Sequence, residues 1–307
     1  MVHFICPVLR KKMGQSLDTF YKNIGTIMRH DSLLKYTIVI ITNAIAVLIF
    51  GISADGGTVN GVKGTGEAAV VGITAEEGQL LALQRARADA VEQTVGINIL
   101  GSTLVRNGLL AGEFLKTFSR GFIVAEKVEW LTLPPLIGKT DGPPIFRYGV
   151  KIEATVMIPE KKIDPGFRLE ASAASSQVSG DIAVITAKVT RKAHVAFFNL
   201  RADDRVAMLY PGADITLMPG ETFRFPPPES GLILEMATLK GHKRDSEAWM
   251  ITAVPVQQGR EFRFTDYFSA DRLYTVPEFF ALYSKFAEIA VEKILPYEVR
   301  SGEKGTF

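Results

Sequence analysis

The chain has 307 residues, of which 47% are hydrophobic and 22% charged, and its formal net charge is +2. Six of its 35 basic residues and two of its 33 acidic residues lie in residues 1–53, so residues 54–307 carry 29 against 31, a net charge of −2. A general nucleic-acid-binding protein needs a basic face for phosphates, so we expect no nucleic acid among the partners.

An uncharged apolar stretch at residues 36–54 predicts export from the cytoplasm. Met28 opens a short basic leader in front of it, which is the layout of a secretory signal. Residues 1–27 are then expected to be an over-extended start. Small residues at the end of the stretch favour cleavage after Ser53 or Ala54.

The same stretch could instead be retained as a membrane span. Nineteen helical residues rise about 28 Å, which is close to the thickness of the hydrocarbon core of a bilayer. Because the positive charges precede the stretch, a retained span would keep the N-terminus in the cytoplasm. We therefore expect a periplasmic or otherwise exported protein, with an inner-membrane anchor through residues 36–54 as the open alternative.

The first half of the exported part predicts an α+β domain at residues 68–160, preceded by a flexible glycine-rich linker at residues 55–67. Thr74 and Glu77 have the spacing of a capping box, which starts a helix. The last strand of the domain alternates apolar and charged residues, which is typical of a sheet with one solvated face. In chain order the pattern predicts a strand at 70–74, a helix at 75–95, a strand at 97–105, a helix at 110–118, and strands at 122–133 and 145–158.

The second half, residues 168–300, predicts a mostly-β, sandwich- or barrel-like domain that ends in a helix. Residues 159–167 form the boundary before it. Turn residues at regular intervals separate short strands at 182–190, 194–201, 205–211, 221–226, 232–240 and 248–255. The C-terminal helix should begin at Thr275 and Pro277 and stop at Pro296, with an apolar stripe of Phe279, Leu282, Phe286, Ile289 and Ala290.

Two glycine motifs resemble phosphate-binding sequences but lack the required context. Gly138-Lys139-Thr140 is similar to the end of a P-loop, yet Leu133 occupies the place of the first glycine. Gly64-x-Gly66-x-x-Ala69 is similar to a dinucleotide fingerprint, yet it falls in the expected linker, with no strand before it. We therefore assign no cofactor-binding residue.

Acidic pairs offer weak candidates for catalysis or metal binding. Asp203 and Asp204 lie at an expected hairpin tip and could bind calcium, although aspartate at a turn more often has a structural role. Glu126 and Glu129 lie three residues apart in a strand, so they should face opposite sides of the sheet.

Histidine, cysteine and basic residues add little. Lys240 to Arg244 is the densest basic cluster and is expected to be a solvated loop, with anion binding as the alternative. Cys6 is the single cysteine, and only His194 and His242 follow residue 53. This leaves little material for a disulfide, a histidine metal site or a nucleophile pair, so we assign no catalytic and no metal-ligating residue.

Residues 72–156 resemble the N-terminal domain of flagellar assembly protein T and its relatives among small envelope lipoproteins. The resemblance is carried by an alanine-rich helix ending in Gln93-Thr-Val-Gly96, the segment Ser119-Arg-Gly121-Phe122-Ile123, and an alternating final strand. It implies a periplasmic, envelope-located protein. The later domains of flagellar assembly protein T are of another kind, so this chain departs from that family in its second half.

The second half resembles a bacterial domain of unknown function that recurs in exported proteins and downstream of caspase-like peptidases and protein kinases. The matching pieces are Leu209-Tyr210-Pro211, Pro219-Gly220, the Pro226 turn and Leu295-Pro296-Tyr297-Glu298. No catalytic residue is attached to that family. Together the two resemblances imply a non-catalytic interaction protein of the cell envelope.

Three functions follow as hypotheses. The first is an exported scaffolding or protein-binding protein whose partners are envelope proteins. The second is a periplasmic small-ligand-binding protein or enzyme with a site between the domains, lined by the aromatic residues Phe262, Phe264, Tyr267, Phe268 and Tyr274. The third is a membrane-anchored accessory subunit of a sensor or of a secretion or motility complex. The sequence leaves the oligomeric state open.

Overall fold

A computed structural model describes six segments of the chain: residues 57–95, 121–137, 143–162, 164–209, 215–259 and 261–302. The chain divides into two units, Met1–Ser53 and Ala54–Phe307, and every described residue belongs to the second. Several predictions fall outside the described residues: the signal or anchor at 36–54, the strand at 97–105, the helix at 110–118 and the Gly138–Thr140 motif.

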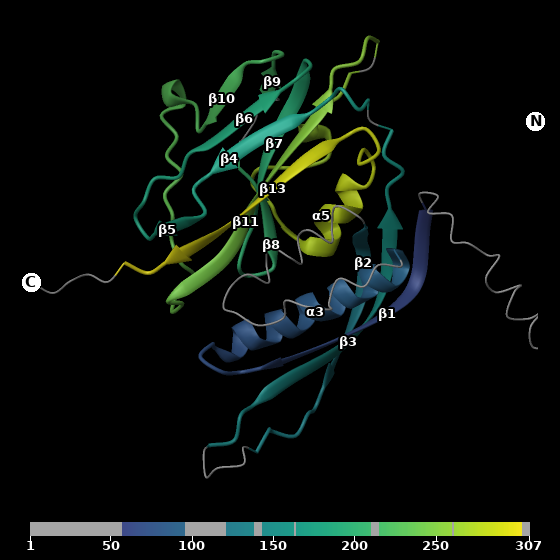
Figure 1. Cartoon of the computed structure of the whole chain (residues 1–307), viewed down its shortest axis with the longest axis vertical. Coiled ribbons are helices and arrows are strands. Elements are labelled where there is room, and N and C mark those ends of the chain that lie inside the picture. Colours follow the sequence, from purple (N-terminus) through teal and green to yellow (C-terminus); the bar gives the residue numbers. More distant parts are fainter. Residues whose placement is uncertain are drawn as a thin grey trace, which may run out of the picture. The chain divides into compact units, whose positions relative to one another are not determined.

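The first part of the described chain is a three-stranded antiparallel sheet with one long helix against it (Figure 1). The strand order is β1-β3-β2, with β1 at Gly57–Ala69, β2 at Phe122–Leu131 and β3 at Arg147–Ile158. Helix α3 spans Ala75–Val95 and packs on β1 and β3. The predicted helix at 75–95 and the strands at 122–133 and 145–158 are confirmed.

The predicted capping box at the start of α3 is also confirmed. The Thr74 N–H donates to Glu77 Oε2 at 2.6 Å, and the Glu77 N–H donates to Thr74 Oγ1 at 3.1 Å. These reciprocal bonds satisfy two of the backbone groups that a helix start leaves without partners.

The prediction of a flexible linker at residues 55–67 is wrong, because this segment is most of strand β1. Its glycines are required for packing. A Cβ atom added to Gly64 would lie 2.0 Å from the Ala86 carbonyl oxygen, and one added to Gly66 would lie 2.0 Å from the Ala82 carbonyl oxygen. The Gly64-x-Gly66 motif therefore brings helix and strand backbones together and has a structural role. The strand predicted at 70–74 is likewise a bend between β1 and α3.

The second part is built on a seven-stranded sheet in the order β12-β8-β7-β11-β13-β5, with β9 also paired to β7. A smaller sheet, in the order β10-β6-β4, packs on one of its faces (Figure 1). The strands are β4 (Leu169–Ala173), β5 (Ser176–Val178), β6 (Ile185–Val189), β7 (Ala193–Leu200), β8 (Arg205–Met208), β9 (Ile215–Leu217), β10 (Thr222–Phe225), β11 (Arg244–Pro255), β12 (Leu273–Thr275) and β13 (Val291–Arg300). Two short 3-10 helices, η1 (Pro228–Ser230) and η2 (Phe264–Asp266), lie in the connections.

Strand β11 is buried on both faces and separates two core clusters. Trp249 and Ile251 point toward the small sheet, whereas Ala248 and Met250 point toward helix α5 (Val276–Tyr283). Because neighbouring side chains of a strand face opposite sides, one strand supplies both cores. The fold is therefore α+β, and the predicted mostly-β second part with a C-terminal helix is confirmed.

The C-terminal helix is shorter than predicted. Its cap at Thr275 and its Pro277 are confirmed, but the helix ends at Tyr283 and the last element is strand β13. Pro296 does not stop a helix. It pairs with Ala248 of β11, while β5 pairs with β13 only at Glu298–Arg300, so the strand is an edge at the proline, where a missing N–H is tolerated.

The strand predicted at 232–240 is also wrong, since this segment forms only an isolated bridge between Ile182 and Glu235. Apart from this bridge, the segment pairs with no described strand. The remaining predicted strands of this part correspond to β6, β7, β8, β10 and β11.

The two parts share a hydrophobic core. Phe122, the first residue of β2, stacks on Phe280 of α5 with ring centroids 5.1 Å apart, and meets Tyr283 edge to face at 5.3 Å. Ala88 of α3 belongs to the same cluster. The predicted domains at 68–160 and 168–300 therefore meet through buried apolar side chains.

We predict that Gly66→Ala will lower the free energy of unfolding by about 3 kcal/mol, because the added methyl group collides with a helix backbone that cannot move alone. The measurement is urea unfolding followed by circular dichroism. Lys63→Ala, an exposed substitution in the same strand, is the control and should change the free energy by less than about 0.5 kcal/mol. Equal effects of the two substitutions would contradict the close packing.

Candidate functional site

The densest group of charged side chains surrounds the tip of the β7–β8 hairpin. The tip is closed by the Arg201 N–H, which donates to the Arg205 carbonyl at 2.8 Å. Asp204 has a φ of +61°, the left-handed region that aspartate tolerates better than most residues. This conformation occurs next to an ion pair that reaches helix α3.

Arg87 of α3 is the centre of that ion pair. Its side chain is 2% exposed and donates four hydrogen bonds to two carboxylates. Glu126 of β2 accepts from Nε at 2.9 Å and from Nη2 at 2.6 Å. Asp204 accepts from Nη1 at 2.6 Å and from Nη2 at 2.9 Å. The guanidinium thus binds both acids in the paired geometry that suits its planar fork.

Burial alone would lower the pKa of Arg87, because it disfavours the charged form. The hydrogen bonds and charges of Glu126 and Asp204 outweigh that effect, so the pKa is raised. The trio holds one positive and two negative charges in a site where Glu126 is only 9% exposed. Removing the cation would leave two acids next to each other with little solvent.

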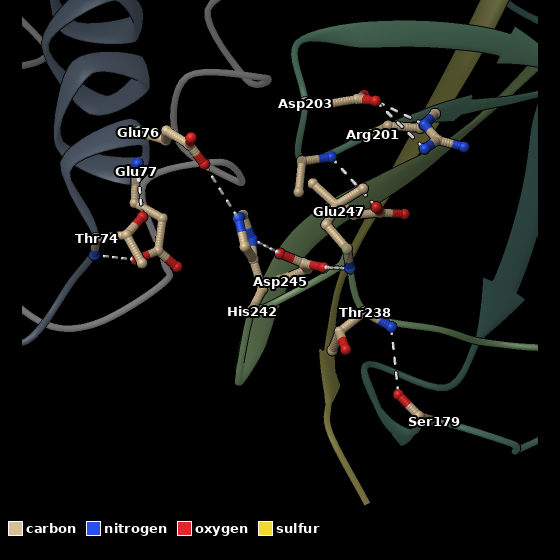
Figure 2. A network of polar contacts seen from close by, with 12 residues as sticks. Thr74, Glu76, Glu77, Ser179, Arg201, Asp203, Thr238, His242, Asp245 and Glu247 are labelled. Carbon is tan, nitrogen blue, oxygen red and sulfur yellow. Dashed lines mark hydrogen bonds and ion pairs between the residues drawn. The ribbon is translucent and has the colours of Figure 1, made fainter.

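The other side of the hairpin rests on Glu247 of β11 (Figure 2). Glu247 Oε1 accepts from the Ala202 N–H at 3.2 Å, and Oε2 accepts from the Asn199 amide at 3.0 Å and from the Tyr297 hydroxyl. Burial, followed by the charge of Glu247, raises the pKa of Tyr297. Arg201 and Asp203 pair beside this group at 3.2 Å. The hairpin tip is therefore fixed from two sides, by a network centred on Arg87 and by a separate network centred on Glu247.

His242 lies near the start of α3, between two carboxylates (Figure 2). Its Nδ1 is 2.6 Å from Asp245 Oδ1, and its Nε2 is 3.9 Å from Glu76 Oε2. Asp245 is buried and also accepts from the Leu239 N–H. A carboxylate that orients an imidazole occurs in hydrolases, where the second ring nitrogen faces a nucleophile. Here the second nitrogen faces another acid.

This setting favours the protonated imidazole. The hydrogen bond to Asp245 is the largest cause of a raised pKa for His242, and the charges of Asp245, Glu77 and Glu76 act in the same direction. When protonated, His242 makes an ion-pair contact between α3 and the β11 end of the second part.

The acidic residues considered as candidates in the sequence take part in ion pairs or are exposed. Asp204 sits at the predicted hairpin tip but binds Arg87, and Asp203 binds Arg201. Glu126 and Glu129 are not a carboxylate pair, since Glu126 bonds Arg87 while Glu129 is exposed. In the described segments, no group of three or more His, Cys, Asp or Glu side chains is arranged to hold a metal ion.

The aromatic residues proposed to line a ligand site lie in the core. Phe262, Phe264, Phe268 and Tyr274 are each at most 7% exposed, and Tyr267 packs beside them. Phe262 meets Phe264 edge to face at 5.0 Å, and Phe268 meets Tyr274 at 5.7 Å. Their ring faces are occupied by one another.

Several residues of the networks had no role assigned from the sequence, among them Arg87, Glu247 and Tyr297. Arg87 lies in a helix with one other basic residue, Arg85, and its partner Asp204 is 117 positions away. Glu247 gives a clearer signal, because it lies in a strand whose other residues are mostly apolar. An acid in such a strand predicts a buried carboxylate with dedicated donors.

Comparisons with known proteins add no relative: no protein-family model matches the chain, and a search of curated proteins finds no match. Within the described segments, no helix has the length and apolar character needed to cross a membrane.

We predict that Arg87→Met will lower the free energy of unfolding by about 3 kcal/mol, because it leaves the nearly buried Glu126 and the partly buried Asp204 without a counter-ion. Adding Glu126→Gln and Asp204→Asn should recover part of the loss. Arg191→Met is the matched control: its pair with Asp164 is about half exposed, and its loss should be about 0–1 kcal/mol. Urea unfolding measures all variants, and a loss below about 1 kcal/mol for Arg87→Met would contradict the buried pair.

A pH dependence follows from the raised pKa of His242. Because the folded protein holds this proton more tightly than the unfolded chain, the contribution is complete below about pH 6.5 and is lost as the pH rises through the raised value. The free energy of unfolding should therefore fall as the pH rises above about 6.5, and the fall should be smaller in His242→Gln. His194→Gln controls for the loss of an imidazole elsewhere in the fold. The same fall in wild type and His242→Gln would refute the assignment.

Proposed function

We propose that this chain is an exported protein of the bacterial cell envelope with a scaffolding role, in which it binds other envelope proteins and does not catalyse a reaction. The partners are recognised through apolar side chains at the free end of the β2–β3 hairpin. The polar networks hold this hairpin in place.

The observation that carries the proposal is the exposure of large apolar residues along this hairpin. Ile137 is 87% exposed and Phe146 is 66% exposed, and Trp130 and Leu136 are each nearly half exposed. Leu136 and Ile145 are joined by an antiparallel bridge with hydrogen bonds of 2.9 and 3.0 Å. Figure 1 shows the hairpin extending past helix α3. Clustered apolar exposure of this kind is typical of a protein-binding surface.

The state of the charged groups supports a structural role for the networks. Each of the carboxylates Glu126, Asp204, Asp245 and Glu247 is engaged by donors from its own chain. A catalytic acid or base needs access to a substrate proton. These acids instead join separate elements of the fold.

Export is supported by the sequence pattern of residues 28–54, a short basic leader followed by an uncharged apolar stretch that ends in small residues. The resemblance of residues 72–156 to an envelope domain supports the same location.

We predict that a C-terminally tagged chain, crosslinked in intact cell envelopes, will retrieve a reproducible set of envelope proteins. Ile137→Glu should reduce their yield about tenfold, since a charge in the apolar surface must be desolvated on binding. Ile233→Glu is the matched control, because Ile233 is 70% exposed but lies in the second part, and its yield should be unchanged.

The same mass-spectrometry run reads the N-terminal peptide of the chain. A start at Ala54 or Asp55 agrees with a cleaved signal, whereas peptides from residues 36–54 would make the chain a membrane-anchored subunit. Recovery of the tagged chain alone, or equal yields from both glutamate variants, would overturn the proposed role of the hairpin.

A further inference from the structure

Strand β2 is an edge of its sheet over most of its length. In the strand order β1-β3-β2 it pairs with β3 on one side, and no described strand pairs with it on the other. Its first three residues are buried or partly buried: Phe122 and Val124 pack in the shared core, and Ile123 packs in the core between α3 and the three-stranded sheet. The seven residues from Ala125 to Leu131 are exposed or partly exposed. Val128 is the midpoint of this open segment.

One face of the open segment carries two apolar side chains, Val128 and Trp130, next to Glu126, which Arg87 of α3 binds. Val128 and Trp130 lie opposite Ile152 and Val150 of β3, so they project from the face of the sheet that α3 covers. The helix packs mainly on β1 and β3, and Val128 and Trp130 are left 41% and 48% exposed. An edge strand with exposed apolar residues is a template for a further strand.

The opposite face carries alternating charges. Lys127 lies opposite Glu153 of β3, which in turn lies opposite Lys63 of β1. Glu129 lies opposite Lys151 in the next row. A strand added beside β2 continues both rows if it places an acid next to Lys127 and a base next to Glu129.

We propose that a second copy of this chain adds to the edge of β2, antiparallel and with a two-fold axis at Val128. In this register Lys127 meets Glu129 of the second copy, and Glu129 meets Lys127 of the second copy. Val128 meets its own equivalent, and Trp130 lies opposite Glu126 of the second copy, with Val128 of the second copy as its diagonal neighbour. The seven open residues of each strand pair completely, which joins two three-stranded sheets into one of six strands.

Neighbouring registers do not fit the charges. A two-fold axis at Lys127 places two lysines opposite each other, and one at Glu129 places two glutamates opposite each other, which is destabilising. A shift of a single residue in the pairing turns apolar side chains toward the charged face. Among these symmetric arrangements, the axis at Val128 is the one that pairs opposite charges directly.

This inference rests on the proposed interaction role and names one partner, the chain itself. It is tested with purified protein, so its outcome does not depend on the retrieval of envelope proteins. A dimer without other partners would leave self-association intact while the proposed function fails. Retrieval of envelope proteins by a chain that forms no dimer would support the proposed function and refute self-association.

The first experiment uses engineered cysteines in the purified full chain, with Cys6→Ala to remove the native thiol. Directly opposite side chains have Cβ atoms about 4.5–5.5 Å apart, near enough for a disulfide after a small adjustment. With diamide as the oxidant, Val128→Cys should give at least about fivefold more disulfide-linked dimer than Val59→Cys on a non-reducing gel. Val59 is the matched control, because it is 43% exposed on β1, the other edge of the same sheet. Equal dimer yields from both would overturn the proposal.

The second experiment reverses the charges and measures self-association by sedimentation. Lys127→Glu alone and Glu129→Lys alone should each weaken the dimer about tenfold, because like charges then face each other across the axis. An equimolar mixture of the two variants should associate as wild type does, since the two glutamates of one chain then face the two lysines of the other. The double variant should also associate as wild type does.

The double variant separates pairing between chains from effects within one chain. Within a chain it places glutamate opposite Glu153 and lysine opposite Lys151, so it should be the least stable variant if only intrachain contacts matter. Melting temperatures of all variants check that each one folds. If neither the mixture nor the double variant forms the dimer again, the register is refuted. If the wild-type chain is monomeric at all concentrations, the dimer itself is refuted.

Discussion

The guanidinium of Arg87 is the constraint on which the arrangement of the elements depends. A cation that is 2% exposed must find acceptors within the protein, because an unpaired buried charge costs several kcal/mol. It donates four hydrogen bonds to carboxylates on β2 and on the β7–β8 hairpin, so they are complete only when α3, β2 and the hairpin lie together. Such pairs add little net stability relative to apolar packing, but they penalise alternative arrangements.

Helix α3 can hold a buried cation because it is covered on more than one side. Ala82, Ala86 and Ala90 recur every four residues and face β1 and β3, where the glycines of β1 allow close approach. Arg87 reaches Glu126 on the β2 edge of the sheet and Asp204 of the hairpin, and Ala88 belongs to the shared core. Helix α3 therefore lacks the single stripe of large apolar residues that is typical of a helix with one buried face. It has small residues on one side and a paired charge on the other.

Local signals allowed much of the fold to be predicted from the sequence. The capping boxes at Thr74 and Thr275 act through neighbours three residues away, and the alternation of β3 reports one covered face. Strand β1 was not predicted, because glycine is usually typical of flexible segments. Here the contact with the helix requires residues without a Cβ atom. The stripe after Tyr283 indicated more helix, but aromatic residues such as Phe286 reach the core from turns. The Arg87 site could not be predicted from local sequence patterns, because the two partners of Arg87 are 39 and 117 positions away.

The buried networks and the exposed hairpin are linked through β2. Phe122 fixes the start of this strand in the core, and Glu126, four residues later, is held by two hydrogen bonds from Arg87. The open edge begins next to that anchor point. A strand that is already ordered loses little conformational entropy when another strand pairs with it, which lowers the cost of association. The charged cluster therefore need not touch a partner to influence binding: by holding β2 rigid at Glu126, it keeps the edge at Val128 and Trp130 in the extended form that pairing requires.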